Sequence, residues 1–353
     1  MKKYKIVSLP GDGIGPEIME SAIDILDLVA KKNKVLFEIQ QKDIGGISID
    51  LHGEPITSDT LKCCLDSDIV LLGAVGGNKW DTLPSNKRPE RGLLQLRKAL
   101  QLYSNIRPAE IFTSLEESSS LKKEVINGVN IIVVRELTGG IYFGNPRGID
   151  GEKGYNTLVY NRGEIERISR VAFELAKNRN NHVISVDKAN VLESSQFWRS
   201  VVHDVHRDFP NVKLEDMYID NAAMQLVSRP KQFDVILTQN LFGDILSDIT
   251  GMITGSLGML PSASLGSKYS LYEPVHGTAP DIAGKNKANP IGMVSSIEMM
   301  FRYTMKNSFA ANQIKNAIEN LLKGGYRTFD IAKNDSKVLT TSQFTKKLIE
   351  FLD

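Results

Sequence analysis

The chain has 353 residues, of which 41% are hydrophobic and 24% charged, and its formal net charge is +1 at pH 7. This is the composition of an ordinary globular protein of about two domains, and the small net charge argues against nucleic acid or an anionic membrane as partner. We expect no signal or transit peptide, because the strand-like run Ile6–Leu9 follows the first residues directly, and no apolar stretch could span a bilayer.

Short apolar runs alternate with helix-length segments along most of the chain. The apolar runs predict strands at Lys5–Leu9, Asp68–Leu72, Val129–Val134, His182–Val186, Val212–Ile219 and Phe233–Thr238. Periodic segments predict helices at Glu17–Lys31, Glu164–Asn178 and Glu193–Phe209. This alternation indicates an α/β protein with a largely parallel sheet, and the glycine-rich polar stretch 147–162 predicts a projecting hairpin or arm.

The first strand leads into the string PGDGIGPE, from Pro10 to Glu17. Its glycines read G-x-G-x-G, whereas a dinucleotide-binding fingerprint reads G-x-G-x-x-G, and Asp12 would lie near the pyrophosphate. The string therefore favours a tight strand-to-helix turn, with Pro16 opening the helix, over a Rossmann site.

The only cysteines, Cys63 and Cys64, are adjacent, which excludes an ordinary disulfide framework. We expect two buried thiols in a reducing compartment, and hence a cytoplasmic protein.

The segment Gly92–Pro108 carries two arginines, Arg97 and Arg107, among leucines at helix-core spacing. Guanidinium groups hold carboxylates through paired hydrogen bonds, so these two arginines and Arg135 could bind a dicarboxylate. Any one of them alone is more often a solvated surface charge.

Several polar residues directly follow predicted strands: residues 73–77, Arg135, Lys188, Asp220 and Asn240. Ligands of open α/β sheets bind outside the carboxyl ends of the strands, so this arrangement predicts a site there. The alternatives stay open, since Lys188 could be an exposed lysine at a helix start and Tyr142 a half-buried aromatic residue.

After the strand Phe233–Thr238 the chain reads NLFGDILSD, with Asp244 and Asp248 four residues apart. On a helix these carboxylates share a face and could hold a hard divalent cation. Alternatively, Asp244 could be an N-cap and Asp248 a first-turn acid favoured by the helix dipole.

The segment Tyr272–Pro290 is rich in proline and glycine, which predicts a loop. It presents His276, Thr278, Asp281 and Asn289, which could hydrogen-bond a sugar or purine. Asp281 could accept both hydroxyls of an adenosine ribose and would repel a 2′-phosphate, although any surface loop carries such residues.

Long strings in the chain resemble the isocitrate/isopropylmalate dehydrogenase family, the β-decarboxylating dehydrogenases. They cover nearly the whole chain: LPGDGIGPE, LLGAVGG, GLLQLRKAL, VRELTGGIYFG, VDKANVL, YIDNAAMQL, NLFGDILSD and EPVHGTAPDIAGKNKANP. The resemblance implies a non-Rossmann fold of two α/β domains sharing a large mixed sheet. It implies a cofactor-binding domain at 1–102 plus 255–353, and a dimerisation and metal/substrate domain at 103–254 with an arm near 147–162.

The resemblance also implies roles for individual residues. Tyr142 and Lys188 look like the family's proton donor and general base. Asp220, Asp244 and Asp248 look like ligands of Mg²⁺ or Mn²⁺, with Lys188 and Asp220 reaching into the site of a partner subunit in a homodimer. The substrate residues implied are Glu90, Leu93, Leu94, Arg97, Arg107, Arg135 and Asp220. The NAD contacts implied are Ile14, Gly77, Glu90, His276, Gly277, Thr278, Ala279, Asp281, Ile282 and Asn289.

The substrate expected is isopropylmalate, oxidatively decarboxylated in leucine biosynthesis. Relatives that act on isocitrate place polar residues where this chain has Leu93 and Leu94, and two leucines offer an apolar wall to a branched alkyl group. The alternatives are tartrate, malate or homoisocitrate as substrate, a non-catalytic regulatory subunit, or a plain metal- or phosphate-binding module. Arg91 and Lys287 have no physical account at this level.

Overall fold

The computed structural model describes residues 3–352 and divides into two compact units. Unit 1 consists of residues 3–102 together with 254–352, and unit 2 consists of residues 103–253. Each unit contains strands covered by helices, so the prediction of an α/β protein is confirmed.

The sheet strands of unit 1 run in the order β2-β1-β3-β12-β11. β2, β1, β3 and β12 run parallel to one another, and β11 runs antiparallel to β12. The bounds are β1 (Lys3–Gly11), β2 (Leu36–Gln41), β3 (Ile69–Ala74), β11 (Pro261–Leu265) and β12 (Ser270–Pro274), with a separate pair β13 (Tyr326–Arg327) and β14 (Lys337–Val338). β3 is buried along its whole length, which explains its unbroken apolar sequence.

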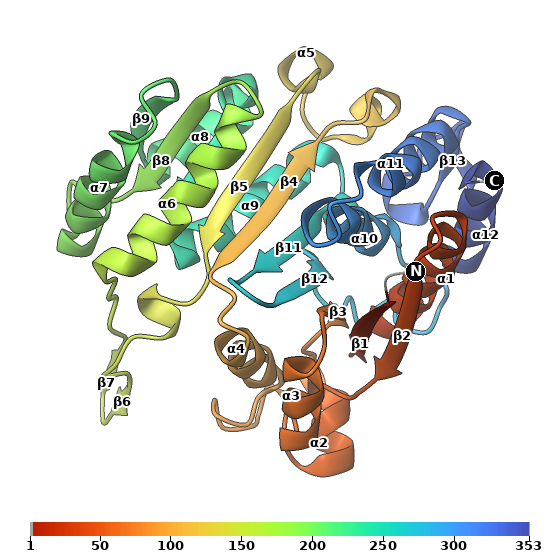
Figure 1. The fold of residues 1–353 in the computed structure, drawn as a ribbon, viewed down its shortest axis with the longest axis horizontal. Helices are drawn as coiled ribbons and strands as arrows, with labels where there is room; N and C mark the ends of the chain where they lie inside the picture. The colour runs from red at the N-terminus through yellow and green to blue at the C-terminus, as the bar shows by residue number, and fades with distance from the viewer. Residues whose placement is uncertain (1–2, 353) are drawn as a thin grey trace. The chain divides into compact units, whose positions relative to one another are not determined.

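The helices of unit 1 pack on this sheet and on one another. α1 and α10 contact the strands directly, and α11 and α12 pack against them (Figure 1). α1 buries Ile18, Ala22, Ile25 and Val29 along one face, the spacing of an amphipathic helix. The bounds are α1 (Gly15–Lys32), α2 (Gly46–His52), α3 (Ser58–Leu65), α4 (Pro89–Ala99), α10 (Ile291–Tyr303), α11 (Ser308–Lys323) and α12 (Thr341–Leu352), with short 3-10 helices η1 (Asn78–Trp80), η5 (Leu257–Met259) and η6 (Phe329–Ile331).

The sheet strands of unit 2 run in the order β4-β5-β10-β8-β9. β4 is antiparallel to β5, and the other pairings are parallel. The bounds are β4 (Ser104–Glu110), β5 (Asn130–Glu136), β8 (His182–Asp187), β9 (Lys213–Tyr218) and β10 (Val235–Thr238). Because β5, β8 and β10 are parallel neighbours, their carboxyl ends lie at one edge of the sheet, where ligands of such sheets bind.

Helices cover both faces of the unit 2 sheet. α6 and α7 lie over one face, and α8 and α9 lie over the other (Figure 1). A core cluster joins α8 and α9 to β5, β8 and β10 through residues such as Leu226, Leu246, Val133 and Ile236. The bounds are α5 (Lys123–Ile126), α6 (Arg162–Lys177), α7 (Glu193–His206), α8 (Ile219–Ser228) and α9 (Asn240–Thr254), with 3-10 helices η2 (Thr113–Ser118), η3 (Gly140–Tyr142) and η4 (Pro230–Gln232).

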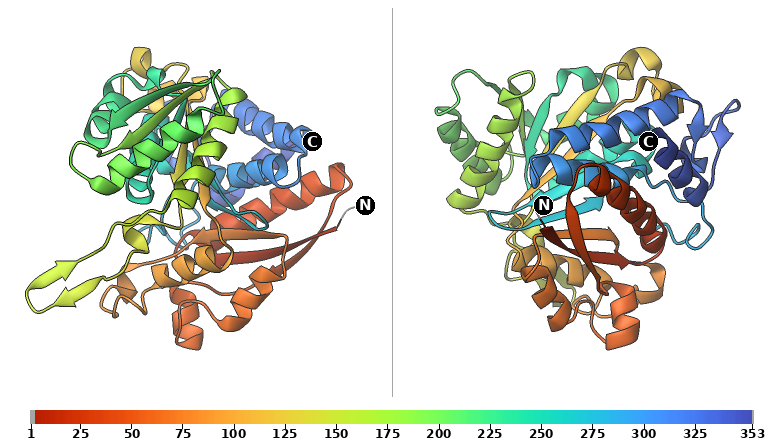
Figure 2. Two further views of the ribbon diagram at one scale, coloured as in Figure 1. Left: turned by 60° about the vertical axis from the view of Figure 1, so that its left-hand side comes forward. Right: turned by 45° about the vertical axis from the view of Figure 1, so that its right-hand side comes forward.

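The predicted arm is a two-stranded hairpin of β6 (Gly148–Asp150) and β7 (Lys153–Tyr155). The hairpin extends away from the rest of unit 2 (Figure 2, left). Ile149 is 87% exposed on it, and Tyr155 is also exposed.

Predicted strands and helices all occur, with ends shifted by a few residues. α6 begins two residues early because Asn161 and Glu164 form a capping box, each side chain accepting from the other's backbone N–H. The structure also contains β2, β4, β11 and β12, which are polar or short and were not predicted as strands. The loop prediction for 272–290 is wrong at its start, because Tyr272 and Pro274 belong to β12.

The expectation of two buried thiols needs correction, because Cys64 is buried but Cys63 is only partly buried.

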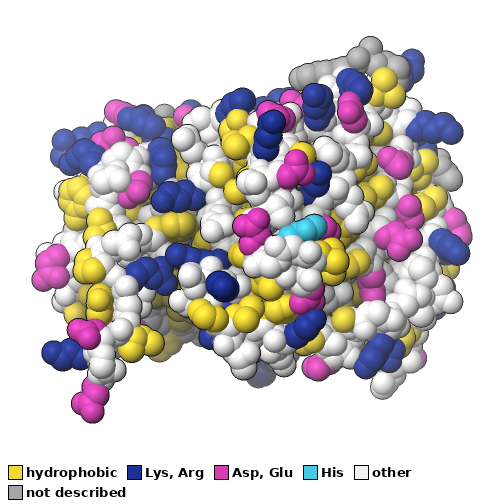
Figure 3. All heavy atoms as spheres, turned by 90° about the horizontal axis from the view of Figure 1, so that it is seen from below, with side chains coloured by type: hydrophobic (Ala, Val, Ile, Leu, Met, Phe, Trp, Pro, Cys, Tyr) yellow, Lys and Arg dark blue, Asp and Glu magenta, His cyan; other side chains and the backbone are white. Residues whose placement is uncertain are grey.

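No helix among residues 3–352 has the length and apolarity needed to cross a bilayer. On the face shown in Figure 3, basic and acidic side chains are both spread among apolar ones, in keeping with the net charge of +1.

Candidate active site

In unit 1 the turn after β1 is organised by a buried carboxylate. Asp12 accepts hydrogen bonds from the backbone N–H groups of Gly46, Ile47 and Gly76 at 2.7, 2.8 and 2.9 Å. Burial raises the pKa of Asp12, while these three donors lower it. The carboxylate therefore ties the turn to α2 and to the glycine loop at 76–77.

The same turn is in backbone contact with the loop that follows β12. Ile14 N donates to Thr278 O at 2.9 Å, and a Cβ built on Gly13 would lie 2.2 Å from that oxygen. Gly13 has a φ of +58°, so a side chain there would also be strained. Three of the predicted cofactor segments, around Ile14, Gly77 and Thr278, are thus brought together.

Of the other predicted cofactor residues, Glu90 lies in the first turn of α4, and the rest lie along the loop 275–289. His276 Nδ1 donates to Gly277 O at 2.9 Å, and burial lowers the pKa of His276. Asp281 is exposed, whereas Asn289 is buried with its amide bonded to Asp330 and to Ile291 N. These hydrogen bonds of Asn289 fix the end of the loop in place.

Helix α4 carries the residues predicted to face the substrate's alkyl group. Leu96 and Leu100 are buried in the core, but Leu93 and Leu94 are only partly buried and remain available to a ligand. Arg97 forms a buried ion pair with Glu273 of β12 at 2.6 Å. Glu273 was not predicted, although it opens the EPVHG string.

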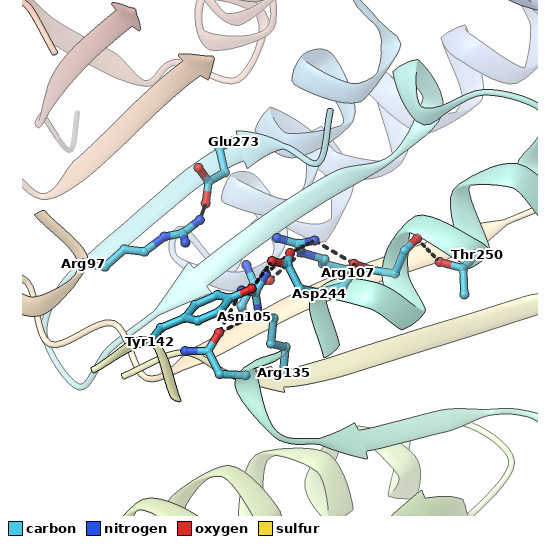
Figure 4. A network of polar contacts seen from close by, with 10 residues as sticks. Arg97, Asn105, Arg107, Arg135, Tyr142, Asp244, Thr250 and Glu273 are labelled. Carbon is cyan, nitrogen blue, oxygen red and sulfur yellow. Dashed lines mark hydrogen bonds and ion pairs between the residues drawn. The ribbon is translucent and has the colours of Figure 1, made fainter. Parts of the chain in front are cut away.

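In unit 2, two buried arginines converge on one carboxylate (Figure 4). Arg135 Nη1 lies 2.5 Å and Arg107 Nη1 3.5 Å from Asp244 Oδ1. Arg135 stands near the end of β5, as the sequence suggested, but Arg107 is in the middle of β4, which continues through Pro108 to Glu110. Neither arginine is a solvated surface charge, so that alternative is wrong for both.

Tyr142 joins the same group from η3. Its hydroxyl donates to Asp244 Oδ2 at 2.9 Å, and the Arg135 guanidinium lies 5.8 Å from the centre of its ring. Burial, followed by the Asp244 charge, raises the pKa of Tyr142 to about 12. Tyr142 is therefore a protonated donor at neutral pH.

Asp244 and Asp248 lie one turn apart within α9, which begins at Asn240. Neither is a cap or a first-turn acid, so that alternative is wrong. Burial raises the pKa of Asp248, Arg107 lowers it, and Asp244 raises it. Two carboxylates on one helix face fit a hard divalent cation, which would offset their repulsion. Within residues 3–352 no group of three His, Cys, Asp or Glu side chains is placed to hold a metal ion.

Lys188 and Asp220 form a second polar pair in unit 2. Lys188 follows β8, Asp220 lies in the first turn of α8, and Lys188 Nζ donates to Asp220 Oδ1 at 2.6 Å. This hydrogen bond lowers the pKa of Asp220. Their side chains are 28% and 63% exposed, so both can reach a group outside this chain.

Two polar residues around the arginines, Asn105 and Ser247, were missed at the level of the sequence. Asn105 Oδ1 accepts from Arg107 Nε at 2.6 Å, and Ser247 Oγ accepts from Arg107 Nη1 at 2.7 Å. No sequence signal could have found them, because such partners are set by tertiary contacts. Asn240, which the sequence placed at the end of a strand, accepts from Arg135 Nε at 3.1 Å.

With this geometry in view, the chain belongs to the isocitrate/isopropylmalate dehydrogenase family, whose model matches residues 5–348. It therefore belongs to a class of oxidoreductases, and the predicted family is confirmed. The structure is similar to an isocitrate dehydrogenase from Methylococcus capsulatus, with a TM-score of 0.88 and 32% identity over 99% of each chain. It is also similar to a β-decarboxylating dehydrogenase from Thermococcus kodakarensis, with a TM-score of 0.80 and 33% identity over 99% of this chain and 96% of that one.

More similar in sequence are proteins named 3-isopropylmalate dehydrogenase. The protein of that name from Chlorobaculum tepidum is 57% identical over 98% of this chain and 99% of its own length. That from Aquifex aeolicus is 54% identical over 100% of this chain and 98% of its own.

Proposed function

We propose that the protein catalyses the NAD-dependent oxidative decarboxylation of 3-isopropylmalate to 4-methyl-2-oxopentanoate and CO₂, a step of leucine biosynthesis. The observation that carries the proposal is the convergence of Arg107, Arg135 and Tyr142 on Asp244. A diacid needs buried guanidinium groups, and its decarboxylation needs a proton donor beside them. The names of the most similar relatives point to the same reaction.

In this proposal the arginines bind the two carboxylates of the substrate, and Leu93 and Leu94 form a wall for the isopropyl group. Burying that group contributes roughly 2–3 kcal/mol, whereas a carboxylate in the same place would be strongly disfavoured. The arginines thus select a diacid, and the leucines select which diacid.

Two side chains move protons. Lys188 Nζ removes the hydroxyl proton of the 2-hydroxy acid, and Tyr142 Oη delivers a proton to the carbon that loses CO₂. The pKa of about 12 keeps Tyr142 protonated for that step. NAD, when bound, supplies a hydride acceptor, and Mg²⁺ or Mn²⁺ supplies a Lewis acid for the charge left by CO₂.

Metal ligands would be Asp244 and Asp248 from one chain and Asp220 from a second copy. NAD would contact Ile14, Gly77, Glu90 and the residues of the loop 276–289. The exposed Asp281 accepts hydrogen bonds from a ribose and repels a 2′-phosphate, so we propose a strong preference for NAD over NADP.

We also propose a homodimer, in which Lys188 and Asp220 of each subunit complete the site of the other. Support comes from apolar side chains on the outer faces of α8 and α9: Met224, Val227, Ile245 and Met252 are 63%, 48%, 48% and 53% exposed. An exposed apolar surface of this kind marks an interaction site. With two unbridged cysteines, we assign the protein to the reducing environment of the cytoplasm.

The function is tested by following formation of reduced nicotinamide from a panel of 2-hydroxy diacids: isopropylmalate, isocitrate, tartrate, malate and homoisocitrate. Each is assayed with NAD or NADP, and with Mn²⁺ or EDTA. We expect turnover of isopropylmalate with NAD, abolished by EDTA. Faster turnover of another diacid would reject the substrate, and equal use of NADP would reject the role given to Asp281.

The substrate wall is tested by Leu94→Ser, which removes apolar surface from a partly buried position. We predict that kcat/KM for isopropylmalate falls roughly 10–100-fold, as expected for losing contacts to an alkyl group. Leu51→Ser, at an exposed leucine of α2, is the control and should leave kcat/KM unchanged. An unaltered kcat/KM in Leu94→Ser would remove this basis for choosing isopropylmalate.

A further inference from the structure

Arg107 and Arg135 each donate a hydrogen bond to a buried asparagine side chain, and Figure 4 labels one of these asparagines, Asn105. Arg107 Nε donates to Asn105 Oδ1 at 2.6 Å. Arg135 donates to Asn240 Oδ1 through Nε at 3.1 Å and through Nη2 at 2.8 Å. Both asparagines are buried, at 0% and 1% exposure, so these bonds are shielded from water.

Strand register explains why Asn105 lies where it does. Asn105 and Arg107 are two residues apart on β4, and Asn105 is the cross-strand partner of Arg135 on β5. All three side chains therefore point to the same face of the sheet. The pairing of β4 with β5 is therefore enough to place Asn105 beside both arginines.

Asn240 is held in one orientation by its surroundings. Its Nδ2 donates to Gly139 O at 3.2 Å, and its backbone N–H donates to the Tyr160 hydroxyl at 2.8 Å. With Nδ2 directed at a carbonyl, Oδ1 must face Arg135. The amide therefore fixes the plane of the guanidinium group and leaves Nη1 directed at Asp244.

These partners are neutral, which matters for a site that binds a dianion. A carboxylate behind each arginine would orient it equally well but would cancel its charge in a buried setting, where charges interact strongly. An amide oxygen accepts the same hydrogen bond without that loss. Asp244 already offsets part of the positive charge of Arg107 and Arg135, as Glu273 does for Arg97. A further carboxylate beside either arginine of unit 2 would therefore leave the pair with little charge to offer a dianion.

We propose that Asn105 and Asn240 are positioning residues whose neutrality preserves, for the carboxylates of the substrate, the positive charge that Asp244 leaves on Arg107 and Arg135. This inference rests on the proposed function, because it assigns the two arginines to a diacid. It adds a requirement on the residues that accept hydrogen bonds from the two guanidinium groups. An acceptor of the same shape with a negative charge would weaken binding of the diacid.

Asn105→Asp is the main variant, since it keeps an acceptor oxygen for Arg107, adds a negative charge and exchanges the amide NH₂ for a second oxygen. Asn240→Asp is a poorer test of charge, because it also replaces the donor to Gly139 O by an oxygen that this carbonyl would repel. For Asn105→Asp we expect KM for the diacid to rise about 20-fold or more, with KM for NAD unchanged. The melting temperature should be unchanged or higher, because the new ion pair is internal.

Two further variants separate charge from orientation. Asn105→Leu removes the acceptor without adding charge, so we expect a smaller rise in KM than in Asn105→Asp, together with a lower melting temperature. Asn130→Asp makes the same chemical change at the start of β5, where exposed Asn130 Oδ1 accepts from Arg179 Nη2 at 2.9 Å. This matched control should leave KM for the diacid unchanged.

Substrate affinity and the function itself are tested separately in this design. Wild-type protein is first assayed with the diacid panel, and the variants are then compared on whichever diacid it oxidises. If Asn105→Asp keeps the wild-type KM, or if Asn105→Leu or Asn130→Asp raises KM as much, the inference is overturned while the function stands. If wild-type protein neither binds a diacid in calorimetry nor oxidises one, both are overturned.

Discussion

The two units hold their predicted site residues in place by different physical means. In unit 1 the turn at Gly11–Gly15 is defined by backbone: Gly13 lies against Thr278 O, and Asp12 collects three backbone N–H groups. In unit 2 the cluster is defined by side-chain charges, with Arg107, Arg135 and Tyr142 directed at Asp244.

This difference predicts how each region fails. A backbone site tolerates a change of surface charge but not an added Cβ, because its close contacts leave no space. A charge cluster tolerates small changes of shape, but each charge is buried beside others, so adding or removing one has a large effect. Mutations that alter charge in unit 2 or add a Cβ in unit 1 test whether the two regions differ in this way.

The largest effect is expected for Asp244→Asn, which keeps the shape and removes the charge to which three side chains are directed. We predict a fall in kcat of roughly 10³-fold or more, since it removes preorganised charge from the reacting centre. Asp208→Asn, in an exposed ion pair with Arg170, is the control and should retain full activity. A modest change in Asp244→Asn would contradict the view of unit 2 as a charge-built site.

A smaller effect is expected for Gly13→Ala, which adds a Cβ 2.2 Å from Thr278 O. We predict that KM for NAD rises about 10-fold and that the free energy of unfolding falls by about 2–4 kcal/mol, because the 278 loop must shift. Gly53→Ala is matched to it: φ is +79°, yet nothing lies within 4 Å of the new Cβ. Gly53→Ala should lower the free energy of unfolding by about 1 kcal/mol and leave KM for NAD unchanged. An equal loss of stability in the two variants would mean that lack of space for the Cβ is not the cause.

The smallest effect is expected from a buried group outside both clusters. Burial raises the pKa of the Cys64 thiol from its usual 9.0 to about 12. Between these values the unfolded chain releases a proton that the folded chain keeps, so the free energy of unfolding should fall as pH rises, by about 1.4 kcal/mol per unit. Denaturant titrations of wild type and Cys64→Ala at several pH values between 8 and 11 measure the free energy of unfolding. Its decrease with rising pH should be less steep in the variant, and an identical pH dependence in the two proteins would contradict the prediction.

Local patterns predicted the elements that bury one continuous apolar face. β3, β5, β8 and β10 were found from runs of Val, Ile and Leu, and α1, α6 and α7 from their periodicity. The strands β2, β4, β11 and β12 were missed, since an edge strand such as LFEIQQ, a polar strand such as SNIRPAE and a short one such as PSASL carry little apolar signal. These segments form strands because they hydrogen-bond to neighbouring strands, which a local sequence pattern does not show.

Site residues divide in a similar way. The sequence alone pointed to the side chains that we propose for the chemistry, because Tyr142, Lys188, Asp244 and the arginines stand in long strings that resemble the family. Tertiary structure decided what lies behind and beside them: Asn105 through the register of β4 with β5, Glu273 opposite Arg97, and Asp12 beneath the glycine loop. The physical reason is that reactive groups are marked by residue type and local position, whereas a hydrogen-bond partner is selected by distance, and distance is set only when remote segments pack together.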